Sequence, residues 1–381
     1  MKPYVPLSLK CLIIAALGSG FASADIIWDA NGTTVASPNP FDGAGTWLDT
    51  DKWWDTTLNA GAGGNFTWSN VTNGASSVQL GNGGLAGAIN LTGGVTVGGI
   101  QFNAVVMPAG PTPGPAGTEE AYSFTGGTLT LGNNAILDLR TNSSTSNTNA
   151  GRIRFQASSV LAGSNASITN ANGGNVSLGL IQFSGSNTWN GNISMTGNGT
   201  GGLFIEALNA AAFNTASKIT INNNASFVVN YASGTNNVAI DVGGTGAASR
   251  GAIRFDTTQT LGGNILLTSA ARITTNTSAG IVGTLSGNIS GAFGLNLNSN
   301  ILSAGTILFK GSNTYTTLTV NRGNAQIGEG GVGTSGTGLT TLNQSTTAGV
   351  VAYISGTGQI KNGLTVTAGQ VRPGDSSGNG L

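Results

Sequence analysis

Apolar and polar residues alternate along most of this chain, in short runs that end at Gly, Asn or Ser. Residues 78–103, 122–139 and 218–230 all show this period of two, with Val, Ile, Leu and Phe at alternate positions. Such runs predict short β-strands with one buried face, and the clusters of small residues between them predict tight corners. We therefore expect an all-β chain.

One strand–corner–strand motif recurs. Residues 181–195 read IQFSGSNTWNGNISM, residues 307–320 read ILFKGSNTYTTLTV, and residues 253–268 give a fainter copy, IRFDTTQTLGGNILLT. A unit of this kind cannot bury its own apolar face, so its copies must stack on one another. Because the spacing between copies is irregular, the array is degenerate and not a strict tandem repeat.

We predict that residues 81–381 form a right-handed parallel β-helix, or β-solenoid, with turns of roughly 20–25 residues. An antiparallel β-sandwich array would also give short alternating strands, but regularly spaced two-residue hairpin signals are missing. Residues 107–120 hold four prolines, which predicts a loop inserted at one corner. The last segment resembles the start of another repeat without a capping turn, so we expect the natural protein to continue past Leu381.

Residues 25–80 differ in composition, since they hold five of the six tryptophans. The first turn of a repeat array needs a cover, so this segment is predicted to be an N-terminal cap. The alternative is a sugar-binding platform, because an indole offers a flat apolar face and an N–H donor. The residues concerned are Trp28, Trp47, Trp53, Trp54 and Trp68.

Residues 1–24 have the pattern of a signal peptide. Lys2 and Lys10 precede an apolar run, and Ala22-Ser23-Ala24 is an A-x-A cleavage site, so cleavage is predicted after Ala24. The mature chain is then secreted, to the extracellular space or the outer cell surface. Since no later stretch reaches about 18 apolar residues, we expect no integral membrane segment.

Residues 285–330 include GNISGAFGL and GTILFKGSNTYTTLTVNRGNAQIG, and this run resembles the autotransporter-associated β-strand repeat. Copies of that repeat combine a Gly-rich strand, a G-x-N-T-Y-T corner and a T-x-V-N-x-G-x-L strand. The resemblance implies a secreted or surface-displayed β-solenoid, often the passenger part of a larger exported protein, with an adhesin-like role. The strand positions that fit are Leu318, Val320, Asn321 and Gly323, whereas Arg322 and residues 325–327 depart from the pattern.

Composition excludes several kinds of chemistry. Histidine is absent, so neither a Ser-His-Asp triad nor a His-ligated metal can be built. The single cysteine, Cys11, lies in the expected signal peptide. Charged residues make up 7% of the chain and the formal net charge is zero. Lys and Arg are dispersed along the sequence, so we expect no nucleic-acid partner.

Two groups of acidic residues are candidate sites. Asp49 and Asp51 begin like a calcium loop, but Trp53 stands where the third ligand belongs. Glu119 and Glu120 fall at the end of the expected loop, where a solvated tip is the ordinary interpretation and a catalytic pair is the alternative. We predict no metal site and no cofactor.

An enzyme acting on polysaccharide would need paired carboxylates, or carboxylates with calcium and an Arg base, on one face. Arg254 and Asp256 share a strand face, but an exposed ion pair is expected there. Acidic residues after Asp55 are few and spread out. We therefore predict no catalytic residues, and a structural or adhesive protein whose partners are extracellular polysaccharide or surface components. A polysaccharide-binding or polysaccharide-degrading β-helix protein is the alternative.

Overall fold

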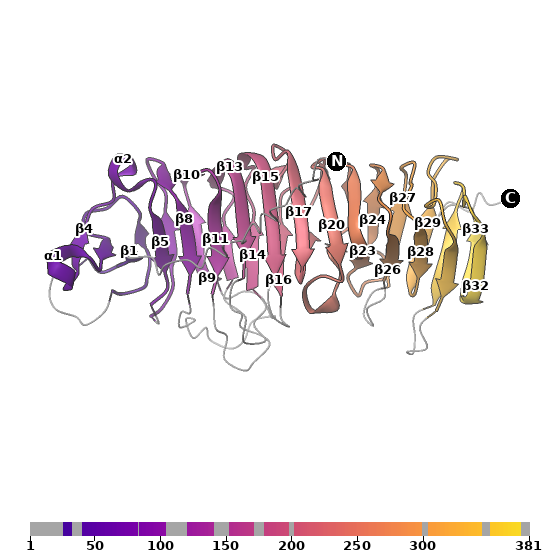
Figure 1. Cartoon of the computed structure of the whole chain (residues 1–381), viewed down its shortest axis with the longest axis horizontal. Coiled ribbons are helices and arrows are strands. Elements are labelled where there is room, and N and C mark those ends of the chain that lie inside the picture. The colour runs from indigo at the N-terminus through magenta and orange to yellow at the C-terminus, as the bar shows by residue number, and fades with distance from the viewer. Residues whose placement is uncertain are drawn as a thin grey trace, which may run out of the picture.

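The structure is a computed structural model, and it shows an elongated stack of β-strands (Figure 1). The all-β prediction is confirmed, because strands dominate and most of them pair in parallel. The expected signal peptide lies outside the described residues, as does the expected loop at 107–120 apart from Glu120, the first residue of a strand. The structure describes residues 26–32, 40–82, 84–103, 120–140, 152–170, 179–197, 202–298, 304–344 and 351–374.

The strands form three long parallel stacks, here called face 1, face 2 and face 3, which the chain visits in that order. Strands β20 (Ile240–Gly244), β21 (Ile253–Phe255) and β22 (Gln259–Leu261) lie on faces 1, 2 and 3. The next strand, β23 (Ile265–Thr275), pairs in parallel first with β20 and then with β21. One circuit of the three faces is therefore one turn of a coil.

Faces 1 and 2 hold most of the strands. Face 1 comprises β1 (Ile26–Trp28), β5 (Ser77–Leu80), β8 (Gly99–Phe102), β11 (Ala135–Leu139), the ends of β13 (Ser159–Thr169) and β15 (Thr188–Gly197), β17 (Lys218–Asn223), β20, the start of β23, and β25 (Ile289–Ser290). Face 2 comprises β2 (Gly45–Thr46), β6 (Ala88–Asn90), β9 (Glu120–Thr125), β12 (Arg152–Phe155), β14 (Gly179–Phe183), β16 (Leu203–Ala207), β18 (Ala225–Val229), β21, the end of β23, β26 (Gly294–Leu297), β28 (Thr317–Val320), β30 (Thr340–Asn343) and β32 (Leu364–Ala368).

Face 3 is interrupted once. The 3-10 turn η1 (Ala210–Ala212) takes the place of a strand between β15 and β19. Face 3 comprises β7 (Val95–Val97), β10 (Gly127–Leu131), the starts of β13 and β15, β19 (Thr235–Asn236), β22, β24 (Val282–Leu285), β27 (Thr306–Phe309), β29 (Gly323–Ile327), β31 (Ala352–Gly356) and β33 (Gln370–Pro373).

The inward side chains of the three faces form one continuous apolar interior. On face 2, Phe124, Phe155 and Phe183 occupy equivalent register positions in successive turns. Their rings stack with centroids 4.7 and 5.3 Å apart, close to the strand spacing of about 4.8 Å. In-register stacking therefore lets large aromatic rings fill the interior.

Backbones approach closely at the corner between faces 3 and 1. A Cβ on Gly263, Gly287 or Gly311 would lie 1.9, 2.1 or 2.2 Å from a carbonyl oxygen of the preceding turn. Beside these glycines, the backbone N–H of Asn288 donates to Oδ1 of Asn264, 24 residues earlier. Glycine is therefore required by space at this corner, and the 24-residue step agrees with the expected turn length here. Turns earlier in the chain are longer than expected, since Leu137 pairs with Ile100 and Leu161 with Leu129.

The buried asparagine of the G-S-N-T corner links three successive turns. Oδ1 of Asn187 accepts the N–H of Leu161 from the preceding turn at 2.9 Å, and its Nδ2 donates to the carbonyl of Ala212 in the next turn at 3.0 Å. Asn313 makes the equivalent pair of bonds. A short side-chain amide thus replaces the ladder hydrogen bonds that a corner would otherwise lose.

The motif copies do not all lie on the same faces. Residues 181–195 and 253–268 both run from face 2 through face 3 to face 1. Residues 307–320 begin on face 3 and end on face 2. The motif therefore specifies a corner between strands, and it does not specify which corner of the coil.

Four tryptophans are packed together at the N-terminal end. Strand β1 pairs antiparallel with β3 (Trp53–Asp55), and β3 with β4 (Gly64–Phe66); the short helices α1 (Leu58–Gly61) and α2 (Asn70–Asn73) belong to the same region. Ring centroids lie 5.2 Å apart for Trp28 and Trp53, 4.6 Å for Trp47 and Trp53, and 5.1 Å for Trp53 and Trp68.

Asp42 connects this N-terminal region to the first turns. Its carboxylate accepts the backbone N–H groups of Gly81, Asn82 and Gly84 and the hydroxyl of Tyr122, which lies 2.5 Å away. Burial raises the pKa of Tyr122 far above its usual value, and the adjacent Asp42 raises it further. The phenol therefore stays protonated and acts as a permanent donor to the carboxylate.

The apolar interior is uncovered at the last described turn. Leu342 and Ile354 are buried, but Val366 and Val371, their register partners in β32 and β33, are 47% and 45% exposed. Within the described ranges, β32 and β33 each pair with one strand only. The continuation past Leu381 stays a prediction.

We predict that Trp53→Ala lowers the free energy of unfolding by about 3–5 kcal/mol, the usual loss for a buried aromatic side chain. Trp53 is fully buried, and its Nε1 donates to the carbonyl of Trp47 at 2.9 Å. Chemical denaturation followed by circular dichroism measures the change. The half-buried Trp54 provides the control, because Trp54→Ala should cost much less; equal losses would contradict a packed cluster centred on Trp53.

We predict that Asn313→Ala lowers the free energy of unfolding by roughly 1–3 kcal/mol, because it leaves the buried N–H of Ile289 and the carbonyl of Thr334 without their side-chain partners. Thermal denaturation compares it with Ser312→Ala, which removes an exposed hydroxyl from the same corner. If both variants unfold like the parent protein, the amide does not hold the turns together.

Candidate charged site on face 2

The acidic residues considered as a calcium site lie in the N-terminal region. Asp51 adopts a left-handed conformation with φ of 57° in the turn before β3, and its carbonyl accepts from Nδ2 of Asn65. Among the described residues, no three acidic, His or Cys side chains gather closely enough to hold a metal ion. Glu119 lies outside the described residues, and the side chain of Glu120 does too.

The aromatic platform considered as a sugar site is largely inaccessible. Trp28, Trp47 and Trp53 are fully buried and Trp68 is 3% exposed, so their flat faces contact protein. Trp54 alone of the five is half-buried. A sugar could therefore reach one indole in this region, not a row of them.

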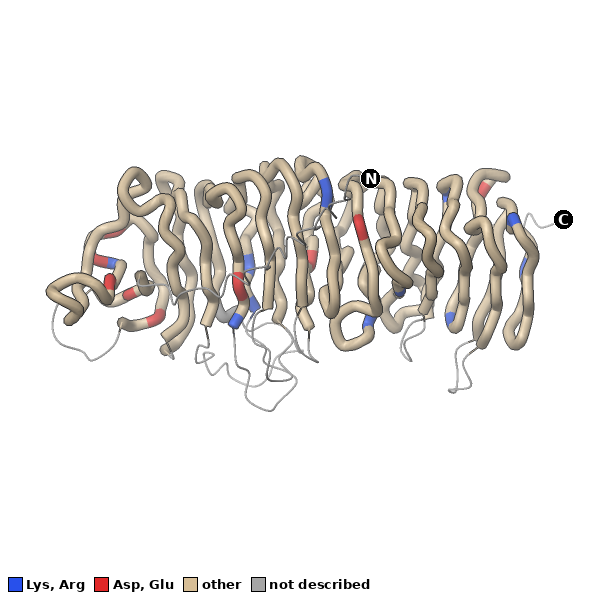
Figure 2. Tube along the Cα trace, in the orientation of Figure 1, with Lys and Arg blue, Asp and Glu red and all other residues tan. Residues whose placement is uncertain are grey.

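Charged residues are sparse along the rod (Figure 2), yet the fold brings most arginines to one face. Five of the eight lie on β12, β21, β23 or the turn before β21, all on face 2. The arginines are therefore dispersed along the sequence but gathered in space. One of them, Arg152, stands in register with Glu120 on β9. The five are Arg152, Arg154, Arg250, Arg254 and Arg272.

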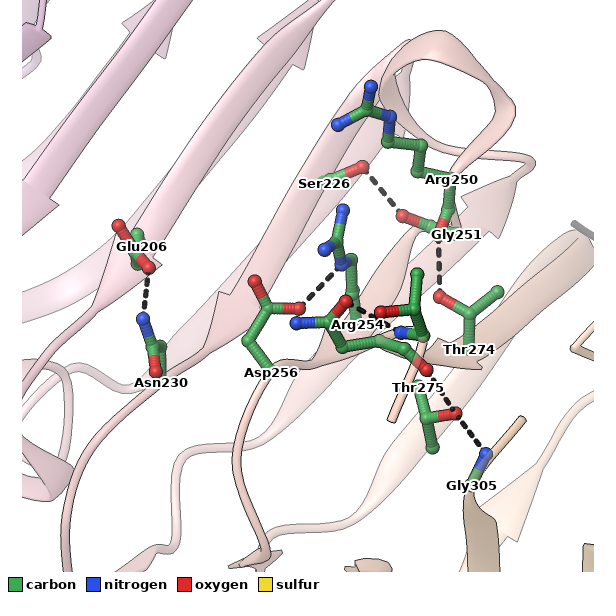
Figure 3. Close-up of polar contacts among 12 residues, drawn as sticks. Glu206, Ser226, Asn230, Arg250, Gly251, Arg254, Asp256, Thr274, Thr275 and Gly305 are labelled. Carbon is green, nitrogen blue, oxygen red and sulfur yellow. Dashed lines mark hydrogen bonds and ion pairs between the residues drawn. The ribbon is translucent and has the colours of Figure 1, made fainter. Parts of the chain in front are cut away.

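Glu206 lies within this face and is held from both sides. Its Oε2 accepts a short hydrogen bond from Nε2 of Gln182 on β14, and its Oε1 accepts from Nδ2 of Asn230 at 2.5 Å (Figure 3). The residue is 8% exposed. Both oxygens of this carboxylate are thus engaged by amides of the preceding and following turns.

Arg254 and Asp256 form the ion pair that their spacing predicts, with Nε and Oδ1 2.5 Å apart (Figure 3). The expectation of an exposed pair was wrong, since the two side chains are only 17% and 20% exposed. Burial raises the pKa of Asp256, and the positive charge of Arg254 opposes that rise. The pair is therefore partly desolvated, and burial shifts the pKa of Asp256 more than the attraction of Arg254 does.

A turn before β21 folds over the outer side of face 2. The hydroxyl of Ser226 accepts the N–H of Ala247 and donates to the carbonyl of Gly251, and the Arg250 guanidinium lies 5.8 Å from the Phe204 ring centre. Ala247 covers a small apolar cluster with Phe204 and Val228. This packing explains why outward side chains of face 2 are buried, a feature that alternation alone does not indicate.

The carbonyls of this turn are also satisfied by arginine and threonine. Nη1 of Arg272 donates to the carbonyl of Ser249 at 2.6 Å, and the hydroxyl of Thr274 donates to the carbonyl of Arg250 (Figure 3). Burial lowers the pKa of Arg272. These contacts fasten the turn to face 2.

We predict that the stability difference between the parent protein and Asp256→Asn falls as pH rises. The pKa of Asp256 is raised from 3.8 in the folded protein, so its contribution to stability is fully present below 3.8 and is lost as pH rises through the folded-state pKa. Urea denaturation of both proteins between pH 3 and about 7 measures this difference. A difference that grows with pH would show that Arg254 outweighs burial.

Comparisons with known proteins found no match for this chain among protein-family models, curated proteins or solved structures. Within the part of the chain that the structure describes, no helix is both long and apolar enough to cross a membrane. What the chain does must therefore be argued from its own residues.

Proposed function

We propose that this protein is a non-catalytic, secreted or cell-surface scaffold with a structural or adhesive role, built as a right-handed parallel β-helix. The observation that carries the proposal is that the described carboxylates of the coil have partners within the coil itself. Four of them form ion pairs, and Glu206 accepts from two amides. The four pairs are Asp138 with Arg140, Asp241 with Lys218, Asp256 with Arg254, and Glu329 with Lys310.

The hand of the coil follows from general physics. Parallel strands joined by a crossover connect in a right-handed sense in nearly all proteins, because the twist of the strands favours it. The A-x-A site before Asp25, the low charge and the resemblance of residues 285–330 to the autotransporter-associated repeat support export. The same resemblance favours display of the rod at a surface.

The enzymatic alternative requires two carboxylates free to act on one sugar unit. Glu206 and Asp256 are the nearest candidates, since both lie on face 2. Glu206 stands in register with Val228, and Val228 with Arg254, so two strand steps of about 4.8 Å each separate β16 from β21. Each carboxylate is held by its own neighbours, and this arrangement favours a structural role for both.

We predict that the purified protein produces no new reducing ends and no unsaturated sugars from a broad panel of polysaccharides, with or without calcium. Glu206→Gln and Asp256→Asn should behave like the parent protein in this assay. Cleavage by the parent protein that either substitution abolishes would overturn the non-catalytic proposal and assign the activity to face 2.

A further inference from the structure

Face 3 differs from the other faces in what it presents outward. Among the strands that the structure describes, those of face 3 carry one charged residue, Arg372. Face 1 carries Lys218, Asp138 and Asp241, and face 2 carries the arginines described above. Just beyond the strands of face 3, Lys310 and Glu329 neutralise each other at 2.6 Å. Face 3 is therefore a long surface with almost no charge.

Threonines with free hydroxyls line this surface. Eight threonines on face 3 strands are half-buried or exposed, and none of their hydroxyls bonds to another described residue. Elsewhere, as at Thr274 and Thr275, threonine hydroxyls bond to the backbone. The eight are Thr96, Thr128, Thr130, Thr188, Thr235, Thr260, Thr284 and Thr306.

The strand register arranges these groups as a lattice. Two outward columns run along the C-terminal half of face 3, with about 4.8 Å between turns and roughly 6.6 Å between columns. One column is Thr260, Thr284, Leu308, Gln326, Ser355 and Arg372, and the other is Val282, Thr306, Asn324, Tyr353 and Gln370. Leu308 and Gln326 are buried, the hydroxyl of Ser355 donates to Oδ1 of Asn324, and the Arg372 guanidinium donates to Oε1 of Gln370. The threonines of this lattice, Thr260, Thr284 and Thr306, keep hydroxyls that bond to no described residue.

The chemistry of this lattice selects a class of ligand. The threonine hydroxyls can both donate and accept hydrogen bonds, so they suit a partner that also does both. A polyanion would gain little from a face with one arginine, and a protein partner would usually require a central aromatic or Arg anchor. The aromatic ring of Tyr353 is already covered by the Arg372 guanidinium, 3.8 Å from its centre.

We propose that face 3 between β22 and β27 binds a neutral polysaccharide, through weak hydrogen bonds to the threonine hydroxyls that lie along the rod. Each bond contributes little, but a repeating ligand on a repeating surface gains affinity from multivalency. This inference rests on the proposed non-catalytic, adhesive function and names the partner for it.

The experiment compares two triple variants that add the same charge to different faces. Thr260, Thr284 and Thr306 lie on three successive strands of face 3, and Thr319, Thr341 and Thr365 lie in one outward column of face 2. Each set is changed to lysine, and circular dichroism verifies that both variants fold. Binding is measured by co-sedimentation with insoluble cellulose and β-1,3-glucan, and with polygalacturonate beads as the anionic probe.

We expect the parent protein to bind a neutral polysaccharide, with little change between 50 and about 500 mM salt because no ion pairs form. The face 3 variant should bind at least about tenfold more weakly, and the face 2 variant should bind like the parent. The proposal is overturned if neither neutral polysaccharide is bound, if both variants weaken equally, or if only polygalacturonate is bound and salt releases it. Cleavage without loss of binding would overturn the non-catalytic function alone, so the two failures are distinguishable.

Discussion

Parallel pairing between successive turns is the constraint on which the rest of this structure depends. Each strand satisfies its backbone groups with the turns before and after it, and within one turn the three faces make few bonds to one another. The corners must therefore keep the same spacing as the strands. Buried asparagines such as Asn187 and close-packed glycines such as Gly287 meet that requirement, the first by side-chain hydrogen bonds and the second by leaving room for a carbonyl.

The same constraint separates the interior from the exterior. Inward positions must repeat similar apolar shapes from turn to turn, as Phe155 and Phe183 do with nearly parallel rings. Outward positions are free of that demand and differ between faces. Outward charged groups have partners nearby, on the adjacent turn for Lys218 with Asp241 and along the same segment of chain for Arg254 with Asp256. Function in such a coil is therefore expected in the outward columns and not in the packing.

Alternation and corner residues were enough to predict an all-β fold, because both are local. The expected turn length fits the later turns, but earlier turns are lengthened by the segments between their strands. The face on which a motif copy falls could not be predicted, since segments of unequal length between strands shift later strands around the coil. For this reason residues 307–320 lie one face away from the position of residues 181–195. The sequence did not predict that five arginines gather on face 2 or that Arg254 and Asp256 are partly buried, because both depend on which face each strand occupies.

The three faces differ in how many charged residues they carry and in what those residues contact. On faces 1 and 2, charged side chains form ion pairs or hydrogen bonds with neighbouring residues. Removing one partner would leave the other charge partly desolvated and without its partner. On face 3, hydroxyls such as those of Thr284 and Thr306 cost little to keep in water, and they bond to no residue that the structure describes. Threonine hydroxyls that the coil orders but that bond to no described residue are available for a ligand, and the low charge around them favours a repeating, hydroxyl-rich one.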